Sequence, residues 1–442
     1  MVPQFGTDGL RGKANVDITP EVAFALAQAA TDFFGSELFL IGRDTRISGS
    51  MIESAMIAGF TSAGANVELL GVVPTPAVAW ASADKGRPGV MISASHNPYW
   101  DNGIKLFAPG GSKLGDDIQH QIQDRMERYL DTKKMPRPED NHVGKVNHSD
   151  SVEGWERSLL NSIDHKLFSD LKIVVDCAHG SASEFAPKIF SRLGADVEVI
   201  GSDPNGVNIN DGFGSTDTQS LRRAVVGRQA DLGLAFDGDA DRLIAVDNEG
   251  NVVDGDRVIA ILAKDLKSLN KLKDNTVVVT VMTNLGFHKA METENISVVI
   301  TGVGDRYVLE ALEKQELSLG GEQSGHIICR DIATTGDGIL AGIQLIAAIK
   351  RSGQNFKSLA EQVMLQVPQV LINVRVSGNP KDNLEKVISE AELIEAGFSG
   401  EGRILVRPSG TEPLIRVMVE HNDEQTARKV AEQLESLIKN QL

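Results

Sequence analysis

Short apolar runs rich in β-branched residues alternate with stretches of helical periodicity along most of this chain. This alternation is typical of layered α/β domains, and it recurs in three successive passes. The expected strands lie at residues 38–41, 65–70, 89–92, 171–175, 195–200, 232–236, 276–281 and 296–300. The expected helices lie at residues 50–63, 76–83, 183–193, 219–226, 257–269, 286–293, 305–315 and 338–349. We therefore expect three divergent copies of one α/β architecture.

The C-terminal part of the chain has a different pattern. A strand at 370–376, a helix at 383–396, two strands flanking 407–413 and a helix at 424–439 predict a small α+β domain. A polar stretch at 131–150 separates the first α/β pass from the second. The expected domains are 1–150, 151–248, 249–366 and 367–442.

Charge and cysteine content exclude several classes of protein. The chain has 44 Lys+Arg against 61 Asp+Glu, a net charge of −17 without a basic block. This argues against a nucleic-acid backbone or an anionic membrane as partner. The two cysteines, Cys177 and Cys329, are too few and too far apart to predict a disulfide framework or a zinc site. With no apolar run long enough to cross a bilayer and no secretion signal, we expect a cytoplasmic protein.

An acidic segment directly follows the expected strand at 232–236, with the sequence DGDADR at 237–242. Asp237, Asp239 and Asp241 alternate with small residues, so their carboxylates can surround one hard cation. The segment is not an EF-hand, because its sixth position is Arg242 where that motif needs glycine. An acidic turn facing water is the alternative. The crowding of three carboxylates favours a Mg²⁺ site that leaves room for a substrate phosphate.

A second segment, SASHNP at 93–98, follows the expected strand at 89–92. It indicates a tight, exposed turn that presents the Ser95 hydroxyl as a nucleophile or phosphate carrier, although a helix N-cap explains the serine equally well. His96, taken singly, is more typical of a hydrogen-bonding scaffold residue. The sequence DNG at 101–103 predicts a hairpin turn. Lys105 beyond it is either a proton carrier or a solvated strand lysine, and its residue pattern alone favours the latter.

Two further loops offer polar groups suited to a sugar phosphate. The segment RPSGTEP at 407–413, with Arg416 three residues beyond, combines hydroxyls, an open backbone and paired arginines. A plain Gly/Pro hairpin would not explain the arginines, so phosphate binding is favoured. The segment GGEQSGH at 320–326 could bind sugar hydroxyls, although a surface turn would look similar. Arginines beside glycine turns in GTDGLRG at 6–12 and GRDTR at 42–46 could each form a structural salt bridge.

Several common motifs are absent. The sequence has no Walker-type phosphate loop, no Gly-x-Gly-x-x-Gly fingerprint and no Gly-x-Ser-x-Gly elbow. It offers instead a hydroxyl nucleophile, a metal loop, a hydroxyl-binding loop and a separate phosphate cradle. Two anion sites favour relocation of a phosphate over hydrolysis, because hydrolysis needs only one.

Taken together, the segments 5–12, 93–98, 237–242, 321–326 and 407–413 resemble the α-D-phosphohexomutase superfamily in order and spacing over nearly the whole chain. The stretches DNGIK at 101–105, VGDRYV at 303–308 and GEQSGH at 321–326 are similar to those of the branch that acts on glucosamine phosphates. The resemblance implies three similar α/β domains with mixed sheets and a smaller α+β C-terminal domain around a central cleft.

The resemblance also implies roles for particular residues. The transfer site would contain phosphorylated Ser95 beside His96, with Lys105 and Arg11 assisting proton transfer. One Mg²⁺ would be held by the phosphoserine together with Asp237, Asp239 and Asp241. The substrate would be bound by Glu322, Ser324, His326, Arg407, Ser409, Gly410, Thr411 and Arg416. Many relatives have a lysine where this chain has Gly302, so a substrate contact from that lysine is not expected here.

The implied reaction interconverts glucosamine 6-phosphate and glucosamine 1-phosphate and supplies amino-sugar nucleotide and cell-wall precursors. Its intermediate would be glucosamine 1,6-bisphosphate, and this compound or glucose 1,6-bisphosphate would activate the enzyme. The alternatives are a phosphoglucomutase or phosphomannomutase of the same superfamily, a metal-dependent sugar phosphatase and a non-catalytic binder. A homodimer is possible, and activation by a kinase or by autophosphorylation is left open. We expect a mobile final domain, hinged near 366–369.

Overall fold

The computed structural model describes residues 3–6, 9–35, 37–133, 137–149, 152–164, 167–376, 384–408 and 414–441. The chain forms two compact units, each described here by itself. The first comprises Met1–Met282 and Ile296–Glu361, and the second comprises Thr283–Asn295 and Gln362–Leu442. Three mixed α/β layers in the first unit and a small antiparallel sheet with helices in the second confirm the expected fold class.

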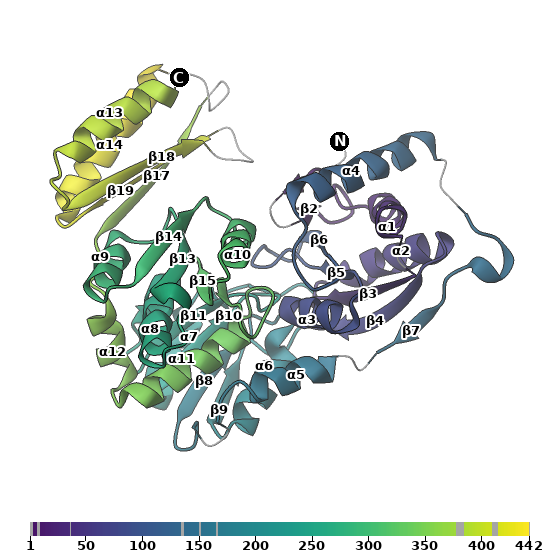
Figure 1. The fold of residues 1–442 in the computed structure, drawn as a ribbon, viewed down its shortest axis with the longest axis horizontal. Helices are drawn as coiled ribbons and strands as arrows, with labels where there is room; N and C mark the ends of the chain where they lie inside the picture. Colours follow the sequence, from purple (N-terminus) through teal and green to yellow (C-terminus); the bar gives the residue numbers. More distant parts are fainter. Residues whose placement is uncertain are drawn as a thin grey trace. The chain divides into compact units, whose positions relative to one another are not determined.

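The first sheet of unit one has the order β1-β2-β6-β5-β3-β4-β7 among the described strands. β3 runs parallel to β4 and β5, whereas β6 runs antiparallel to β2 and β5. Helices α1, α2 and α4 cover one face and α3 the other (Figure 1). The strands are β1 Phe5–Gly6, β2 Gly9–Lys13, β3 Leu38–Arg43, β4 Asn66–Val72, β5 Gly89–Ile92, β6 Asp101–Phe107 and β7 Val146–His148. The helices are α1 Pro20–Phe34, α2 Gly49–Ser62, α3 Thr75–Lys85, α4 Asp116–Thr132 and a 3-10 helix at Asp140–His142.

The core of this layer forms where α1 and α2 pack on β3. The buried side of α1 is rich in alanine, which lets the two helices lie close together. Phe39 of β3 and Phe60 of α2 stack beneath them with ring centroids 4.1 Å apart. Burying each such ring stabilises the fold by about 2–3 kcal/mol. This rigid layer holds the carboxyl ends of β3 and β5, from which two of the candidate segments begin.

The second sheet has the order β12-β11-β10-β8-β9, in which β10 is parallel to β8 and antiparallel to β11. The segment DGDADR therefore joins two adjacent strands as a tight loop between β10 and β11. The strands are β8 Lys172–Asp176, β9 Asp196–Ile200, β10 Leu232–Phe236, β11 Leu243–Asp247 and β12 Val252–Val253. The helices are α5 Val152–Leu160, α6 Ala182–Arg192 and α7 Gln219–Arg228.

The third sheet has the order β14-β13-β15-β16, with β13 parallel to β14 and β15. β15 and β16 form a hairpin whose tip carries the expected sugar loop. The strands are β13 Thr276–Thr280, β14 Ser297–Thr301, β15 Leu319–Gly321 and β16 Ile327–Cys329. The helices are α8 Gly255–Ser268, a 3-10 helix at Lys273–Asn275, α10 Asp305–Lys314, α11 Gly338–Ser352 and α12 Phe356–Val363.

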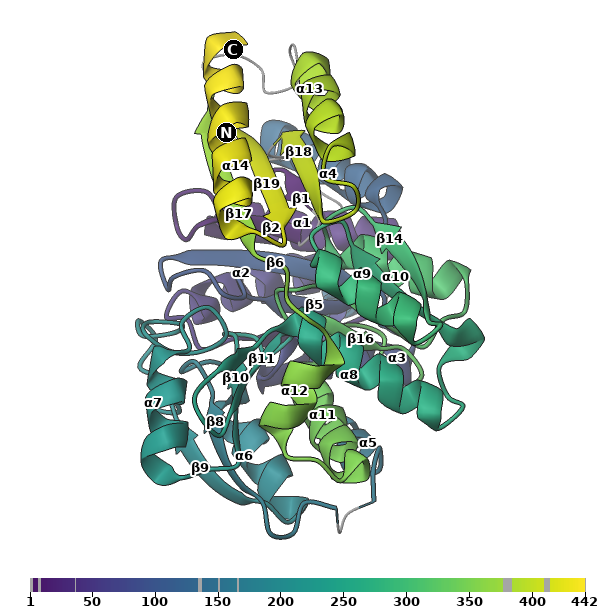
Figure 2. The ribbon, with the colours of Figure 1, turned by 90° about the vertical axis from the view of Figure 1, so that its left-hand side faces the viewer.

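Unit two is an antiparallel sheet of order β17-β19-β18 with helices on one face. α13 and α14 lie side by side against this sheet (Figure 2). The strands are β17 Gln369–Arg375, β18 Gly402–Pro408 and β19 Leu414–His421, and the helices are α9 Leu285–Thr293, α13 Leu384–Ala396 and α14 Glu424–Gln441. Helix α9 belongs to this unit although the strands before and after it, β13 and β14, belong to the other.

One local prediction is wrong. Residues 101–103 do not form a hairpin turn but open strand β6, which pairs with both β2 and β5. Gly103 is required there by close packing, because a Cβ on it would lie 2.6 Å from the Ser93 carbonyl oxygen and 2.7 Å from that of Leu10. The glycine permits a crowded interior strand, which local turn preferences do not anticipate.

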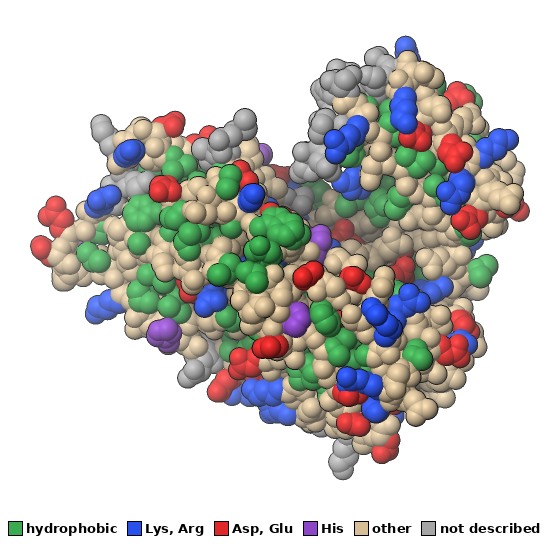
Figure 3. All heavy atoms as spheres, turned by 180° about the vertical axis from the view of Figure 1, so that it is seen from behind, with side chains coloured by type: hydrophobic (Ala, Val, Ile, Leu, Met, Phe, Trp, Pro, Cys, Tyr) green, Lys and Arg blue, Asp and Glu red, His purple; other side chains and the backbone are tan. Residues whose placement is uncertain are grey.

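On the face drawn in Figure 3, acidic and basic side chains are interspersed, so neither sign of charge covers a continuous area there. No helix within the described part of the chain is both long and apolar enough to span a bilayer.

Candidate active site

Ser95 lies in a strained turn directly after β5. Its φ is +53°, in the left-handed region that costs a residue with a Cβ about 1 kcal/mol. Its backbone N–H donates to Ser93 Oγ (2.9 Å), and its side chain is fully buried. None of the described residues 93–100 is helical, so the helix N-cap interpretation of this serine is wrong.

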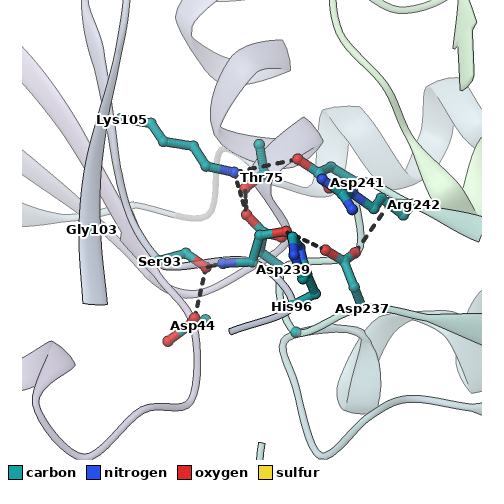
Figure 4. A network of polar contacts seen from close by, with 12 residues as sticks. Asp44, Thr75, Ser93, His96, Gly103, Lys105, Asp237, Asp239, Asp241 and Arg242 are labelled. Atoms are coloured by element: carbon teal, nitrogen blue, oxygen red, sulfur yellow. Dashed lines mark hydrogen bonds and ion pairs between the residues drawn. The ribbon is translucent and has the colours of Figure 1, made fainter. Parts of the chain in front are cut away.

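The acidic loop lies against this serine. Asp237, Asp239 and Asp241 are all buried, and one carboxylate oxygen from each lies within 4.8 Å of the others. Ser95 Oγ donates a hydrogen bond to Asp237 Oδ2 over 2.6 Å. Figure 4 labels Asp237 within this cluster of polar contacts. A Cβ at Gly238 would lie 2.7 Å from the Ser95 carbonyl oxygen, so glycine is needed for the two loops to approach this closely. The interpretation as an acidic turn facing water is wrong.

Lys105 points from β6 into the same cluster. Its ammonium group contacts Asp239 Oδ2 at 2.6 Å and Asp241 Oδ2 at 3.3 Å (Figure 4). Thr75, at the start of α3, also donates to Asp239 Oδ2 over 2.6 Å. Lys105 is only 2% exposed, which excludes the solvated strand lysine.

Electrostatic interactions separate the three carboxyl groups by pKa. Burial and the charges of Asp241 and Asp239 hold the pKa of Asp237 well above its usual range. Burial also raises the pKa of Asp241, but Lys105 and the nearby His326 outweigh it and bring that pKa well below its usual range. Asp239 has a lowered pKa because Lys105 and Thr75 overcome the effects of burial and of Asp241. The loop thus keeps two carboxylates ionised beside a serine that donates to the third.

The donor set of this loop fits a hard divalent cation. Three carboxylates offer oxygen ligands of the kind that Mg²⁺ and Ca²⁺ prefer. Asp239 Oδ1 and Asp241 Oδ1 are buried and have no hydrogen-bond partner among the described residues. Buried carboxylate oxygens without a partner are costly, and a bound cation would satisfy them. The chain therefore has an acidic cluster capable of holding a metal ion.

His96 and Arg11 lie at the edge of the cluster. His96 Nδ1 lies 3.3 Å from Ser95 Oγ. Burial and the nearby charges of Arg242 and Arg11 lower the pKa of His96 to about 4, so the imidazole is neutral near pH 7. Arg11 is placed by β2, where it pairs with Gly103 of β6. Both residues expected from the resemblance therefore lie beside the serine turn.

The expected sugar loop (residues 320–326) pairs through its backbone with the end of the acidic loop (residues 237–242). Arg242 and His326 form an isolated antiparallel β-bridge, and Leu243 N donates to the Gly325 carbonyl oxygen over 2.9 Å. His326 Nδ1 lies 3.7 Å from Asp241 Oδ2. Ser324 is exposed at the tip of the loop. The second and third sheets thus bring together two segments that are far apart in the sequence.

Glu322 is fixed from the segment VGDRYV. Its carboxylate accepts a hydrogen bond from Gly304 N over 3.2 Å, and burial raises its pKa. Asp305 follows Gly304 in the chain. Its Oδ2 lies 3.4 Å from His326 Nε2 and also forms an ion pair with Lys113. A Cβ at Gly302 would meet only the Tyr307 ring, at 3.8 Å, so packing does not require a glycine at this position.

The arginines of the expected phosphate cradle lie in unit two. Arg407 of β18 and Arg416 of β19 are directly opposite in the strand register. Burial and the charge of Arg416 lower the pKa of Arg407. Like charges directly opposite each other in a sheet repel, and two guanidinium groups so placed can bind one phosphate. Ser409, Gly410 and Thr411 lie outside the described residues.

Family models for all four parts of one fold match this chain in order. They are phosphoglucomutase/phosphomannomutase alpha/beta/alpha domain I (residues 2–133), domain II (153–250) and domain III (254–367), and the C-terminal domain (371–437). The chain belongs to the phosphoglucomutase/phosphomannomutase family, which is the α-D-phosphohexomutase superfamily of the expected resemblance. The domain boundaries expected after residues 150, 248 and 366 stay predictions beside these ranges.

Within the family, the similarity extends to a particular enzyme. A phosphoglucosamine mutase of Staphylococcus carnosus is 49% identical, with 100% of this chain and 99% of that protein covered. A phosphoglucomutase/phosphomannomutase family protein from Burkholderia thailandensis has a TM-score of 0.83 at 23% identity, covering 99% of this chain and 98% of that one. Aspergillus fumigatus N-acetylphosphoglucosamine mutase, solved with GlcNAc-6P and magnesium, has a TM-score of 0.71 at 18% identity, covering 100% and 96%. A serine-to-alanine variant of that enzyme, solved with glucose 1,6-bisphosphate, has a TM-score of 0.69 at 17% identity, covering 100% and 95%.

Several contacts with the site residues were not predicted from the sequence. Thr75 on Asp239 and Gly304 on Glu322 each make a hydrogen bond to an expected site residue. Thr75 and Pro76 follow strand β4 closely, and this position is typical of the strand-end loops that hold functional residues. Asn210 and Arg46 also contact the serine turn. No sequence pattern marks Asn210, whereas Arg46 belongs to the segment GRDTR at 42–46, in which arginines lie beside a glycine turn.

Proposed function

We propose that this chain is a phosphoglucosamine mutase that interconverts glucosamine 6-phosphate and glucosamine 1-phosphate through phosphorylated Ser95. The observation that carries the proposal is the 2.6 Å contact from Ser95 Oγ to Asp237, in a buried loop of three carboxylates suited to a divalent cation. The 49% identity to a phosphoglucosamine mutase over the whole chain supports the choice of substrate within the family.

The chemistry is the transfer of one phosphoryl group in each direction. The P–O bond to Ser95 Oγ breaks as a P–O bond forms to a sugar hydroxyl, which loses its proton, and glucosamine 1,6-bisphosphate results. The bisphosphate turns round and returns its other phosphate to Ser95. Glucosamine or glucose 1,6-bisphosphate would load Ser95, as the complex of the Aspergillus enzyme with glucose 1,6-bisphosphate supports. The proton lost by the sugar hydroxyl ends on Ser95 Oγ, which becomes a free hydroxyl again. Lys105 and Arg11, placed beside the serine turn, would assist this transfer by stabilising negative charge on the two oxygens.

The acidic loop manages charge. A phosphoserine carries about −1.5 to −2 charges near neutral pH, and this charge must be held beside three carboxyl groups. Asp237, Asp239 and Asp241 would hold Mg²⁺, which neutralises charge on the phosphoryl group during transfer. Magnesium in the complex of the Aspergillus enzyme supports this assignment. Lys105 supplies a fixed positive charge in contact with two of the carboxylates.

Substrate selection would use the other two loops. Glu322, Ser324 and His326 would bind the sugar hydroxyl and amino groups, and the raised pKa of Glu322 reflects how dry its position is. Arg407 and Arg416, with Ser409, Gly410 and Thr411 of the same loop, would hold the phosphate that is not being transferred. Paired guanidinium groups suit this role because they bind phosphate in both substrate orientations without recognising the sugar.

The test uses Ser95→Ala, with Ser54→Ala as the matched control. Ser54 is an exposed serine on α2 that donates to the Ser50 carbonyl oxygen. Ser95→Ala should lose turnover of glucosamine 6-phosphate and the protein-bound phosphoryl group seen by intact mass, whereas Ser54→Ala should keep both. Undiminished turnover in Ser95→Ala would exclude the carrier role.

The same assay separates the alternatives. Turnover of glucose or mannose phosphates at a rate above that of glucosamine phosphate would indicate a phosphoglucomutase or phosphomannomutase. Release of inorganic phosphate in place of the isomer would indicate a phosphatase. Failure of a small amount of protein to convert excess substrate would indicate a binder.

A further inference from the structure

A single buried guanidinium group lies beneath the serine turn. Arg46 follows β3, and its side chain is completely shielded from solvent. Its Nε donates to Asp44 Oδ2 over 2.8 Å. Its remaining N–H groups donate to the backbone carbonyl oxygens of Ser95 (2.9 Å), Asn97 (2.8 Å), Asp101 (3.1 Å) and Pro98. An arginine side chain has five N–H donors, and here each has its own acceptor.

The backbone N–H of Ser95 is connected to the same Asp44–Arg46 ion pair through Ser93. Ser95 N donates to Ser93 Oγ over 2.9 Å, and Ser93 Oγ donates to Asp44 Oδ2 over 2.7 Å (Figure 4 shows the contact with Asp44). Asp44 Oδ1 accepts from Arg46 N over 3.0 Å. Both backbone polar groups of Ser95 are therefore held by the Asp44–Arg46 pair, one directly and one through Ser93.

A second contact with the turn comes from the loop between β9 and α7. Asn210 Nδ2 donates to the carbonyl oxygens of Ser95 (2.9 Å) and Asn97 (3.1 Å), two of the four that Arg46 binds. Asn210 is itself fixed, because its backbone N donates to the Ala178 carbonyl oxygen over 2.9 Å. The turn is thus held by residues from two loops, one after β3 and one after β9, while the Ser95 hydroxyl donates to Asp237 of the acidic loop.

We propose that Arg46 is a positioning residue that, with Asp44 and Asn210, fixes the left-handed turn of Ser95 and so the direction of its Oγ. The inference rests on the proposed function, in which the same oxygen must be in line with two different sugar oxygens in turn. A nucleophile or leaving group displaced by about 1 Å can lose about 100-fold in rate. Lysine cannot replace this arginine, because an ammonium group offers three donors from one point and cannot span four carbonyls.

The test compares Arg46→Lys and Asn210→Ala with the control Arg43→Lys. Arg43 lies three residues away and pairs with Glu53 at 3.2 Å, outside the serine turn. The readouts are kcat, KM and the single-turnover rate at which glucose 1,6-bisphosphate loads a phosphoryl group onto the protein, followed by intact mass. Arg46→Lys should lower kcat and the loading rate by about 100-fold with KM nearly unchanged. Asn210→Ala should lower both by less, and Arg43→Lys should change neither.

The outcomes are distinguishable. Loading rates equal to wild type in Arg46→Lys and Asn210→Ala, or losses confined to KM, overturn the positioning role. If Arg46→Lys fails to fold, as judged by circular dichroism and thermal unfolding, Asn210→Ala decides, because it leaves the Asp44–Arg46 pair in place. A wild-type chain that gains no phosphoryl group would overturn the carrier role of Ser95 and this inference with it, whereas equal loading by all variants overturns the positioning role alone.

Discussion

Lys105 shows how much one charge can matter where water is excluded. Its ammonium group is the counter-charge in direct contact with both Asp239 and Asp241. Alternation along β6 predicted only that Lys105 faces away from its apolar neighbours. It did not show that this face is covered by a loop from another sheet, because that depends on the packing of distant segments. Burial changes an ordinary strand lysine into part of the site.

Replacing Lys105 by methionine keeps the length of the side chain and removes the charge. We expect the free energy of unfolding without added metal to fall by about 3 kcal/mol, because two buried carboxylates lose their partner. Mg²⁺ should then stabilise Lys105→Met more than wild type, since the cation has no competing ammonium group. Urea unfolding with and without Mg²⁺ measures both effects.

The matched control for this substitution is Lys357→Met, which removes a surface pair with Glu249 (2.8 Å). It should change stability little, and the effect of Mg²⁺ should stay as in wild type. Equal stabilisation of wild type and Lys105→Met by Mg²⁺ would contradict the placement of the metal beside Lys105.

At the scale of single elements, helix α11 begins at a carboxylate that is costly to ionise. Asp337 is its N-cap, accepting from Leu340 N and from Trp155 Nε1, each over 2.9 Å. Complete burial raises its pKa to about 6 from 3.8. Between about pH 4 and pH 6, Asp337 is therefore protonated in the folded state and ionised in the unfolded state. Over this window the contribution of Asp337 to stability falls as the pH rises, and it stays low above pH 6.

Asp337→Asn removes this titration. Relative to wild type, the variant should gain about 3 kcal/mol of unfolding free energy between pH 4 and pH 7, whatever its absolute stability. Urea unfolding of both proteins across this range measures the difference. A constant difference between the two would show that Asp337 has an ordinary pKa.

Asp423→Asn should change the pH dependence of stability in the opposite direction. Asp423 accepts from Thr426 N (3.0 Å) and Thr426 Oγ1 (2.6 Å) at the start of α14, and these hydrogen bonds lower its pKa. Its contribution to stability is present above the unfolded pKa and is lost as the pH falls. Relative to wild type, this variant should lose stability as the pH rises towards about 4, and the difference between the two proteins should then stay constant. The two substitutions therefore change stability in opposite directions and in different pH windows.

Elements with strong local signals were predictable, and those defined by distant partners were not. Helix α11 was expected from its apolar run. Helix α1 was missed although Thr19 caps it, Pro20 opens it and Gly35 closes it, so its local signals were there to be used. The strand conformation of residues 101–103 had no such signal, because the pairing of β6 with two non-adjacent segments outweighs the Asn-Gly turn preference. Ser95 was found by its motif, but its left-handed conformation depends on Arg46 and Asn210.

At the scale of the whole molecule, the division into two units does not follow the order of the chain. The backbone passes between them after Met282, after Asn295 and after Glu361, so three peptide crossings connect the units. The expected hinge near 366–369 lies inside unit two. There, Val367 N donates to Asn284 Oδ1 (3.0 Å) and Asn284 Nδ2 donates to the Val367 carbonyl oxygen (2.9 Å). Any rotation of the final domain should therefore carry α9 with it.

Glu420 is the residue that anchors α9 in unit two. It is fully buried in β19 and accepts from Leu285 N (2.9 Å), Asn284 Nδ2 (3.0 Å) and Arg403 Nε (2.6 Å). Glu420→Ala should lower the free energy of opening of α9 by about 3 kcal/mol, because it removes one partner from a buried charged network. Hydrogen exchange followed by mass spectrometry should then show faster exchange in α9 and β19, with β13 and β14 unchanged.

The control is Glu395→Ala, which removes the 2.7 Å contact of Glu395 with Ile404 N and so loosens α13 against β18 without touching α9. It should speed exchange there and leave α9 protected. If Glu420→Ala instead speeds exchange in α9, β13 and β14 together, α9 opens with the third sheet. The two units would then divide after Glu361 alone, and a rotating C-terminal domain would leave α9 behind. Faster exchange in α9 and β19 alone requires the helix to move with the sheet of unit two.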